Sequence, residues 1–200
     1  MTDYNKLYNG LSRVAWGYFF TCIDINFGTV SILPSFVGYL LFLSAISYLK
    51  DEERELSLLR TLGVILAVWH GAQWIASWVS SSLDGVWQFA DIIIGIVNLY
   101  FYFQLITDLA SIAAKYQPEG YTLDSKLLRY RTIQTVLLTA ILVITNFHSW
   151  LLEIWSVVSI VMMIVHLIVG ICLMIALFKL RKCISEDNER KCISENNEPM

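Results

Sequence analysis

Charged residues are scarce in this 200-residue chain. Lys, Arg, Asp and Glu make up 16% of it, whereas 56% of the residues are apolar. Soluble domains carry about 25% charged residues, and one of this size has too small an interior to bury so much apolar surface. The shortage of charge therefore excludes a soluble globular fold and indicates a protein embedded in a lipid bilayer.

Enzyme motifs are also missing. The chain has no His-Glu-x-x-His zinc motif, no Gly-x-Ser-x-Gly nucleophile motif, no P-loop and no Gly-x-Gly-x-x-Gly loop. Its four cysteines lack the spacing of metal ligands. We therefore expect no catalytic residue and no cofactor. Nucleic-acid binding is not expected either, because acidic residues are mixed with the basic ones in the polar connectors.

Long apolar runs are what the chain has instead. A helix needs about 20 apolar residues to cross the hydrocarbon layer of a bilayer, and six such runs alternate with short polar connectors. The sequence predicts an all-α fold, a polytopic membrane bundle of six transmembrane helices. The expected spans are Leu7 to Asn26, Pro34 to Leu49, Leu58 to Ser80, Gln88 to Leu109, Leu127 to Asn146 and Leu151 to Phe178.

Basic residues occur on one side only of this predicted bundle. All 14 Lys and Arg residues lie in or near the N-terminal segment, the second and fourth connectors and the C-terminal tail. The other connectors, near Phe27 to Leu33, Ser81 to Trp87 and Phe147 to Trp150, contain none. Cytoplasmic segments of membrane proteins carry the excess of Lys and Arg. The distribution therefore predicts that both termini are cytoplasmic.

The end of the chain contains a tandem repeat. We expect residues 1–182 to form the transmembrane bundle and residues 183–200 to form a disordered cytoplasmic tail. RKCISEDNE at Arg181 to Glu189 is followed by RKCISENNE at Arg190 to Glu198, and two copies are too few to build a repeat fold. Contact of the Arg-Lys pairs with acidic lipid headgroups is an alternative role for the repeat.

Polar residues inside the predicted spans follow single helix faces, as Asp91, Asn98 and Tyr102 do in the fourth span. One interpretation is structural, because such residues hydrogen-bond across helix interfaces. The other is a polar binding pocket in the outer half of the bundle, where no Lys or Arg neutralises the carboxylates and protons or cations would be attracted. The candidate pocket residues are Asp24, Gln73, Asp91, Asn98, Asn146 and Glu153.

Two further residue pairs are candidates for a specific role. Arg13 and Asp108 lie near the cytoplasmic ends of the first and fourth spans, and we expect them to form a structural ion pair. His70 and His166 lie at similar depths in the third and sixth spans and are weak candidates for metal binding, through a haem held between them. An intramembrane enzyme or haem-binding redox protein is therefore the alternative to a non-enzymatic protein.

The first predicted hairpin has a recognisable pattern. GLSRVAWGYFFTCIDINFG is followed by SILPSFVGYLLFL, which places an Ile-Asp, a Gly turn, an Ile-Leu-Pro and a Gly-Tyr in order. This hairpin resembles the opening hairpin of uncharacterised multi-pass membrane proteins of Gram-positive bacteria (Firmicutes). The resemblance implies a bacterial cell membrane and brings no activity with it. The matching residues are Asp24, Gly28, Pro34, Gly38 and Tyr39, while Ser31 and Ser35 replace Asp residues of the pattern.

The sequence therefore predicts an integral membrane protein without a soluble domain. Its leading functions are a non-enzymatic accessory or interaction subunit, or a small transporter that uses the outer polar pocket. The expected partners are the lipid bilayer and either another membrane protein or a second copy of the chain.

Overall fold

The computed structural model describes residues 3–22, 26–27, 30–31, 34–53, 55–79, 87–147 and 155–196, which form six helices and one pair of very short strands. The helices are α1 (Tyr4–Cys22), α2 (Ser35–Leu49), α3 (Leu56–Val79), α4 (Trp87–Tyr116), α5 (Leu123–Phe147) and α6 (Trp155–Asn196). The strands β1 (Asn26–Phe27) and β2 (Val30–Ser31) pair antiparallel between α1 and α2. The expected all-α class is confirmed, and its physical reason is that a helix satisfies its own backbone hydrogen bonds in lipid.

Four helices contain a segment that is long and apolar enough to cross a bilayer. In the described part of the chain these segments are Leu56–Ala76, Phe89–Tyr116, Leu123–Ile144 and Ile160–Glu186. Large apolar side chains on them point outward, with Phe89 77% exposed and Met163 70% exposed. Extended apolar surface is unfavourable in water and favourable in lipid, so these helices indicate a membrane-embedded protein. Helix α2 is also apolar but has only 15 residues.

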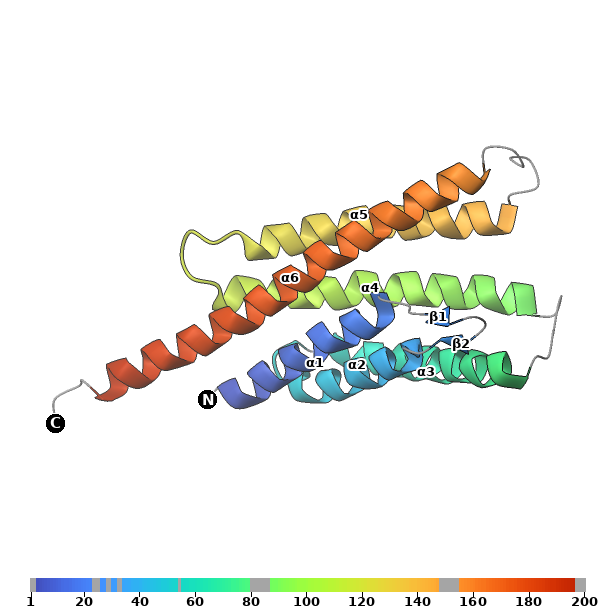
Figure 1. The fold of residues 1–200 in the computed structure, drawn as a ribbon. Helices are drawn as coiled ribbons and strands as arrows, with labels where there is room; N and C mark the ends of the chain where they lie inside the picture. Colours follow the sequence, from blue (N-terminus) through green and yellow to red (C-terminus); the bar gives the residue numbers. More distant parts are fainter. Residues whose placement is uncertain are drawn as a thin grey trace.

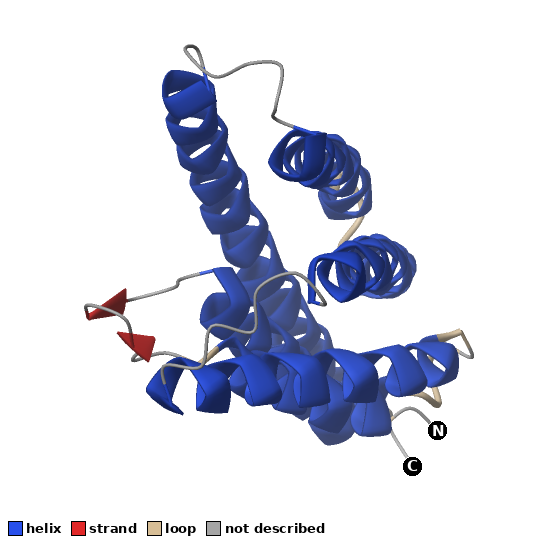
Figure 2. Ribbon diagram, turned by 90° about the vertical axis from the view of Figure 1, so that its right-hand side faces the viewer, coloured by secondary structure: helices blue, strands red, loops and turns tan. Residues whose placement is uncertain are grey.

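The six helices close into a ring. Each helix packs against the next one along the chain, α6 packs back against α1, and α4 also contacts α6. The start of α1 and the end of α6 lie at the same end of the bundle (Figure 1). We call this the inner end, and the opposite one the outer end. Figure 2 shows the two short strands beside the helices, outside the bundle.

Two glycines allow α1 and α2 to approach each other closely. A Cβ atom added at Gly38 would lie 2.7 Å from the backbone oxygen of Gly17, and one added at Gly17 would lie 2.9 Å from the backbone oxygen of Gly38. Small residues at helix crossings have this role in membrane proteins, where apolar burial alone does not drive helices together. The Gly38 that the hairpin pattern singled out is therefore a packing residue.

Aromatic rings fill the centre of the bundle. Tyr18 of α1, Phe42 of α2 and Phe101 and Tyr102 of α4 are almost fully buried. The ring centroids of Phe42 and Phe101 are 5.6 Å apart, and those of Tyr18 and Tyr102 are 5.8 Å apart in an edge-to-face arrangement. Such pairs add to the stability that area burial alone provides. The centre is therefore a close-packed aromatic core.

At the inner end, the connector between α2 and α3 is fastened to α4. The Ser111 hydroxyl donates a hydrogen bond to Glu53 Oε1 (2.7 Å), and Lys115 Nζ lies 3.1 Å from the same oxygen. Gln104 Nε2 donates to Glu55 Oε2 (2.7 Å). We call these five residues the inner clamp. The hydrogen bond from Ser111, together with Lys115, holds the pKa of the Glu53 carboxyl below its ordinary value.

Helix α6 continues beyond the point at which the sequence predicts a disordered tail. It runs through Lys182 to Asn196, and Cys183 and Ile184 are buried at 5% and 0% exposure. Arg181 donates a hydrogen bond to Ser12 of α1 (3.3 Å). The repeat is rich in Lys, Arg and Glu, which have good helix propensity, and its first residues pack on the bundle. The expected boundary at residue 182 therefore does not coincide with a structural boundary.

Candidate functional site

Polar residues from three helices meet in the outer half of the bundle. Gln73 Nε2 of α3 donates a hydrogen bond to Asp91 Oδ1 of α4 (3.0 Å). The Tyr39 hydroxyl of α2 donates to Asn98 Oδ1 of α4 (2.8 Å). We call Tyr39, His70, Gln73, Asp91 and Asn98 the polar cluster. Its two hydrogen bonds connect α2, α3 and α4.

His70 joins the two hydrogen-bonded pairs. Its imidazole stacks on the ring of Tyr39, with centroids 5.0 Å apart and planes inclined by only 8°. It also lies within electrostatic reach of the Asp91 carboxylate. Its Nε2 atom is buried and has no hydrogen-bond partner among the described residues. His70 therefore has one ring nitrogen that a proton, a water molecule or a ligand could engage.

Exposure falls steadily across the polar cluster. Gln73 and Asp91 are exposed near the outer end, His70 and Asn98 are half-buried, and Tyr39 is only 2% exposed. Along the cluster, the exposed carboxylate of Asp91 is followed by the half-buried imidazole of His70 and then by the buried hydroxyl of Tyr39. Such an arrangement can stabilise helix packing, and its carboxylate can attract a cation or a proton.

A second interior hydrogen bond lies on the other side of the core. The Tyr18 hydroxyl of α1 donates to Gln134 Oε1 of α5 (2.9 Å), and Gln134 is only 3% exposed. Sequence reasoning missed both residues. Gln134 is the polar residue that recurs one turn after Tyr130 and Arg131, so helical periodicity could have identified it.

The structure brings together only part of the pocket that the sequence predicts. Gln73 and Asp91 are hydrogen-bonded to each other, and Asn98 lies further along the same face of α4, bonded to Tyr39. Asp24, Glu153 and the side chain of Asn146 lie outside the described residues. The described side chains of the predicted pocket are thus Gln73, Asp91 and Asn98, and all three belong to the polar cluster.

The expected ion pair between Arg13 and Asp108 is not formed. The Arg13 guanidinium donates to Ser44 Oγ and lies 4.2 Å from the ring centroid of Tyr48, both on α2. Asp108 is 3% exposed and accepts a hydrogen bond from Gln104 Nε2 of its own helix (2.8 Å). The prediction was wrong because α1 packs against α2 and α6, so Arg13 finds its partners on α2.

The two histidines of the weak haem hypothesis are on helices that are not neighbours in the ring. His70 is on α3, which packs against α2 and α4, whereas His166 is on α6, which packs against α5 and α1. The structure therefore does not pair them. Among the described residues, no group of three or more His, Cys, Asp or Glu side chains is arranged to hold a metal ion.

Comparison with protein-family models, with curated proteins and with solved structures gave no match.

Proposed function

We propose that this chain is a bacterial cell-membrane protein with six crossings and cytoplasmic termini, and that it acts as a non-enzymatic accessory or interaction subunit. The observation that carries the proposal is the pairing of polar groups across helices. Three hydrogen bonds each join two helices: Gln73 with Asp91, Tyr39 with Asn98, and Tyr18 with Gln134. Hydrogen bonds of this kind between membrane helices define packing.

The charge distribution supports the proposed orientation. The polar connectors expected at the inner end carry the Lys and Arg residues, and the expected outer connectors carry none. The resemblance of the first hairpin supports a bacterial membrane. A reporter that is active only in the cytoplasm should be active when it is fused to the C-terminus. Activity of a reporter that functions only on the outer side of the membrane would contradict the orientation.

A packing role for the polar cluster is compatible with an accessory subunit, which needs a rigid shape and a partner in the same membrane. The experiment is cross-linking in the native membrane, followed by purification in mild detergent and identification of the cross-linked chains. We expect a second membrane protein at a fixed ratio. Recovery of only the monomer would contradict the proposal, and recovery of only a cross-linked homo-oligomer would replace it by self-association.

The isosteric variant Asp91→Asn sharpens this test. It removes the carboxylate charge but leaves a side-chain oxygen that can accept the hydrogen bond from Gln73. If the polar cluster serves packing, the variant should retain the cross-linked partner at the same ratio. Loss of the partner in a folded Asp91→Asn protein would show that the charge itself matters.

A small transporter for protons or cations is the second candidate. The observation that favours it is the buried Nε2 of His70, which lies near the exposed carboxylate of Asp91. Reconstituted into vesicles, such a protein should move protons or alkali cations, and Asp91→Asn should abolish the flux. The matched control is Glu119→Gln, which removes an exposed carboxylate at the inner end. Absence of any flux from the unmodified protein would exclude this candidate.

A further inference from the structure

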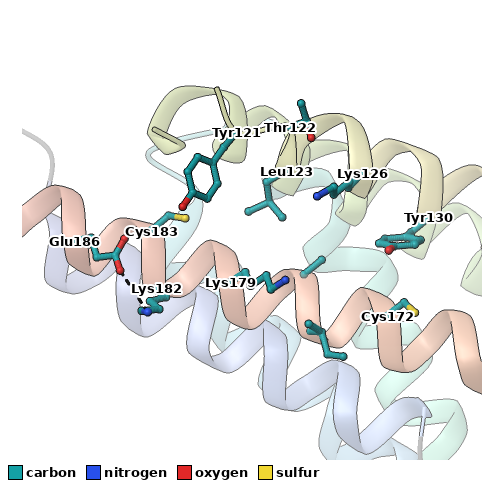
Figure 3. Close-up of a pocket in the computed structure, with 12 residues that line it drawn as sticks. Tyr121, Thr122, Leu123, Lys126, Tyr130, Cys172, Lys179, Lys182, Cys183 and Glu186 are labelled. Atoms are coloured by element: carbon teal, nitrogen blue, oxygen red, sulfur yellow. Dashed lines mark ion pairs between the residues drawn. The ribbon is translucent and has the colours of Figure 1, made fainter. Parts of the chain in front are cut away.

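A hollow of about 460 Å³ lies between α5 and α6 at the inner end. One wall is formed by the start of α5 and the connector before it, and the other by the segment of α6 from Cys172 to Glu186 (Figure 3). We call this hollow the α5–α6 groove. It is bounded by Tyr121, Lys126 and Tyr130 on one side and by Cys172, Lys179 and Lys182 on the other.

Hydrogen bonds fix the connector that forms one rim of the groove. Gln117 Nε2 donates a hydrogen bond to Asp124 Oδ1 (2.9 Å), and Gln117 Oε1 accepts a hydrogen bond from the backbone amide of Leu123 (2.8 Å). Gly120 completes the turn with a φ of 85°, which side-chain-bearing residues rarely adopt. The rim is therefore built into the fold.

The groove carries an excess of positive charge. Three lysines line it, and one carboxylate, that of Glu186, lies 3.5 Å from Lys182 Nζ. Lys126 of α5 and Lys179 of α6 stand on opposite walls (Figure 3). Neither forms a salt bridge with any described residue. Two ammonium groups from two helices thus remain available to one anion.

The groove is also amphipathic along its length. Its lysine-rich end lies toward the end of α6, and its other end contains Cys172, Tyr130 and the 47% exposed Ile175. From Cys172 to Lys182 the helix rises roughly 15 Å. A distance of this length is sufficient to reach from the headgroup level of a bilayer into the acyl region.

We propose that the α5–α6 groove is a binding site for an anionic phospholipid. The headgroup phosphate lies between Lys126 and Lys179, which supply charge-assisted hydrogen bonds. An acyl chain follows the apolar wall at Ile175 toward the membrane interior. Basic pockets between helices on the cytoplasmic side of a membrane are suited to such headgroups. The proposal depends on the chain being embedded in a membrane and not on its accessory role.

The test measures lipid binding to the purified, delipidated full-length chain by native mass spectrometry. The probes are dioleoyl phosphatidylglycerol and dioleoyl phosphatidylcholine. We expect preferential retention of phosphatidylglycerol, and at least a tenfold loss of its affinity in the double variant Lys126→Gln, Lys179→Gln. Equal binding of the two lipids by the unmodified chain would overturn the proposal.

Matched variants separate the groove from general surface charge. Lys50→Gln with Arg129→Gln removes the same charge from exposed positions outside the groove lining, and it should retain phosphatidylglycerol. The double variant Lys126→Arg, Lys179→Arg keeps the charge and should also retain it. An equal loss in the Lys50 and Arg129 variant, or in the arginine variant, would contradict a specific site.

A soluble phosphate compound is the other source of the same chemistry. Millimolar inorganic phosphate or glycerol phosphate should not displace phosphatidylglycerol, because neither contributes an acyl chain. Displacement by either compound would overturn the proposal in favour of a soluble ligand. Circular dichroism and the elution volume in detergent verify that each variant is folded before its binding is interpreted.

Discussion

The carboxylates at the two ends of the bundle have different partners. In the inner clamp, Glu53 receives a hydrogen bond from Ser111 and lies 3.1 Å from the ammonium group of Lys115. In the polar cluster at the outer end, Asp91 receives its hydrogen bond from the neutral amide of Gln73. The inner clamp thus includes one pair of opposite charges beside its amide and hydroxyl donors, whereas the polar cluster uses only amides, a phenol and an imidazole around its carboxylate.

The difference follows from where the cations are. If all Lys and Arg residues are retained on one side of the membrane, an outer carboxylate has only neutral donors within reach. A charge paired with a cation is a structural element, whereas a charge paired with an amide keeps its net charge and remains able to attract a cation. For this reason, the outer half is the better place to look for ion-linked function, and the inner end for lipid binding and stability.

The largest expected effect comes from replacing the same residue type at the two ends. Gln104→Leu leaves the 3% exposed Asp108 without its hydrogen-bond donor and also removes the hydrogen bond to Glu55. We expect it to lower the free energy of unfolding by about 2 kcal/mol, mainly through Asp108. Gln73→Leu removes the hydrogen-bond donor of Asp91, but this carboxylate is exposed and water can solvate it. The loss in the free energy of unfolding should therefore be less than about 1 kcal/mol. Unfolding in detergent, followed by tryptophan fluorescence, measures both. Equal losses would break the comparison between the two ends.

Disturbing the close approach of α1 and α2 in the outer half should lower the free energy of unfolding nearly as much. Gly38→Ala pushes a Cβ atom against the backbone oxygen of Gly17, and overpacking of this kind should cost about 1 to 2 kcal/mol after the gain in helix propensity. The control is Gly71→Ala, where the nearest atom is 3.9 Å away, and stability should not fall. The same fluorescence assay applies, and a stable Gly38→Ala protein would argue against shape as the main constraint on α1 and α2.

The hydrogen bond between Tyr39 and Asn98 should contribute less. A double-mutant cycle with Tyr39→Phe and Asn98→Leu isolates its coupling energy, which we expect to be about 0.6 kcal/mol, the average for hydrogen bonds between membrane helices. The matched cycle with Tyr18→Phe and Gln134→Leu should give a similar value. A coupling energy near zero in both cycles would remove the packing role assigned to these bonds.

The smallest effect is a pH dependence at the inner end. The pKa of Glu53 is lowered in the folded protein relative to its ordinary value of 4.5. The stabilisation that this carboxylate provides is therefore complete above that value and is lost as the pH falls through the folded pKa. Unfolding at pH 7 and at pH 4 should show a smaller difference in Glu53→Gln than in the unmodified chain. An unchanged difference would mean that Glu53 does not contribute to acid sensitivity.

Sequence reasoning located the helices better than it predicted which side chains of different helices contact each other. Periodicity and hydropathy identified six helical segments, and each overlaps one observed helix. The same reasoning placed Asp91 and Asn98 on one face of α4, which the structure retains. It failed for Arg13 and Asp108, because depth in the membrane says how far along a helix a residue lies but not which neighbouring helix it faces.

In the tail, helix α6 continues into a segment whose composition favours disorder. Short repeats with many charges are typical of disordered segments, yet the same charged residues favour a helix once a preceding helix has been nucleated. Burial of Cys183 and Ile184 against the bundle adds the packing that an isolated segment lacks. Composition alone cannot show that such a surface is available.

By itself, the sequence determined that this chain is helical and membrane-embedded, because apolar length and the need to satisfy backbone hydrogen bonds in lipid are local properties. Only the tertiary structure decided that α6 returns to α1, that Tyr39 meets Asn98, and that lysines of α5 and α6 face one groove. These contacts depend on how each helix is rotated about its axis and which helices become neighbours. Close packing of the whole bundle sets both, and no single segment encodes them.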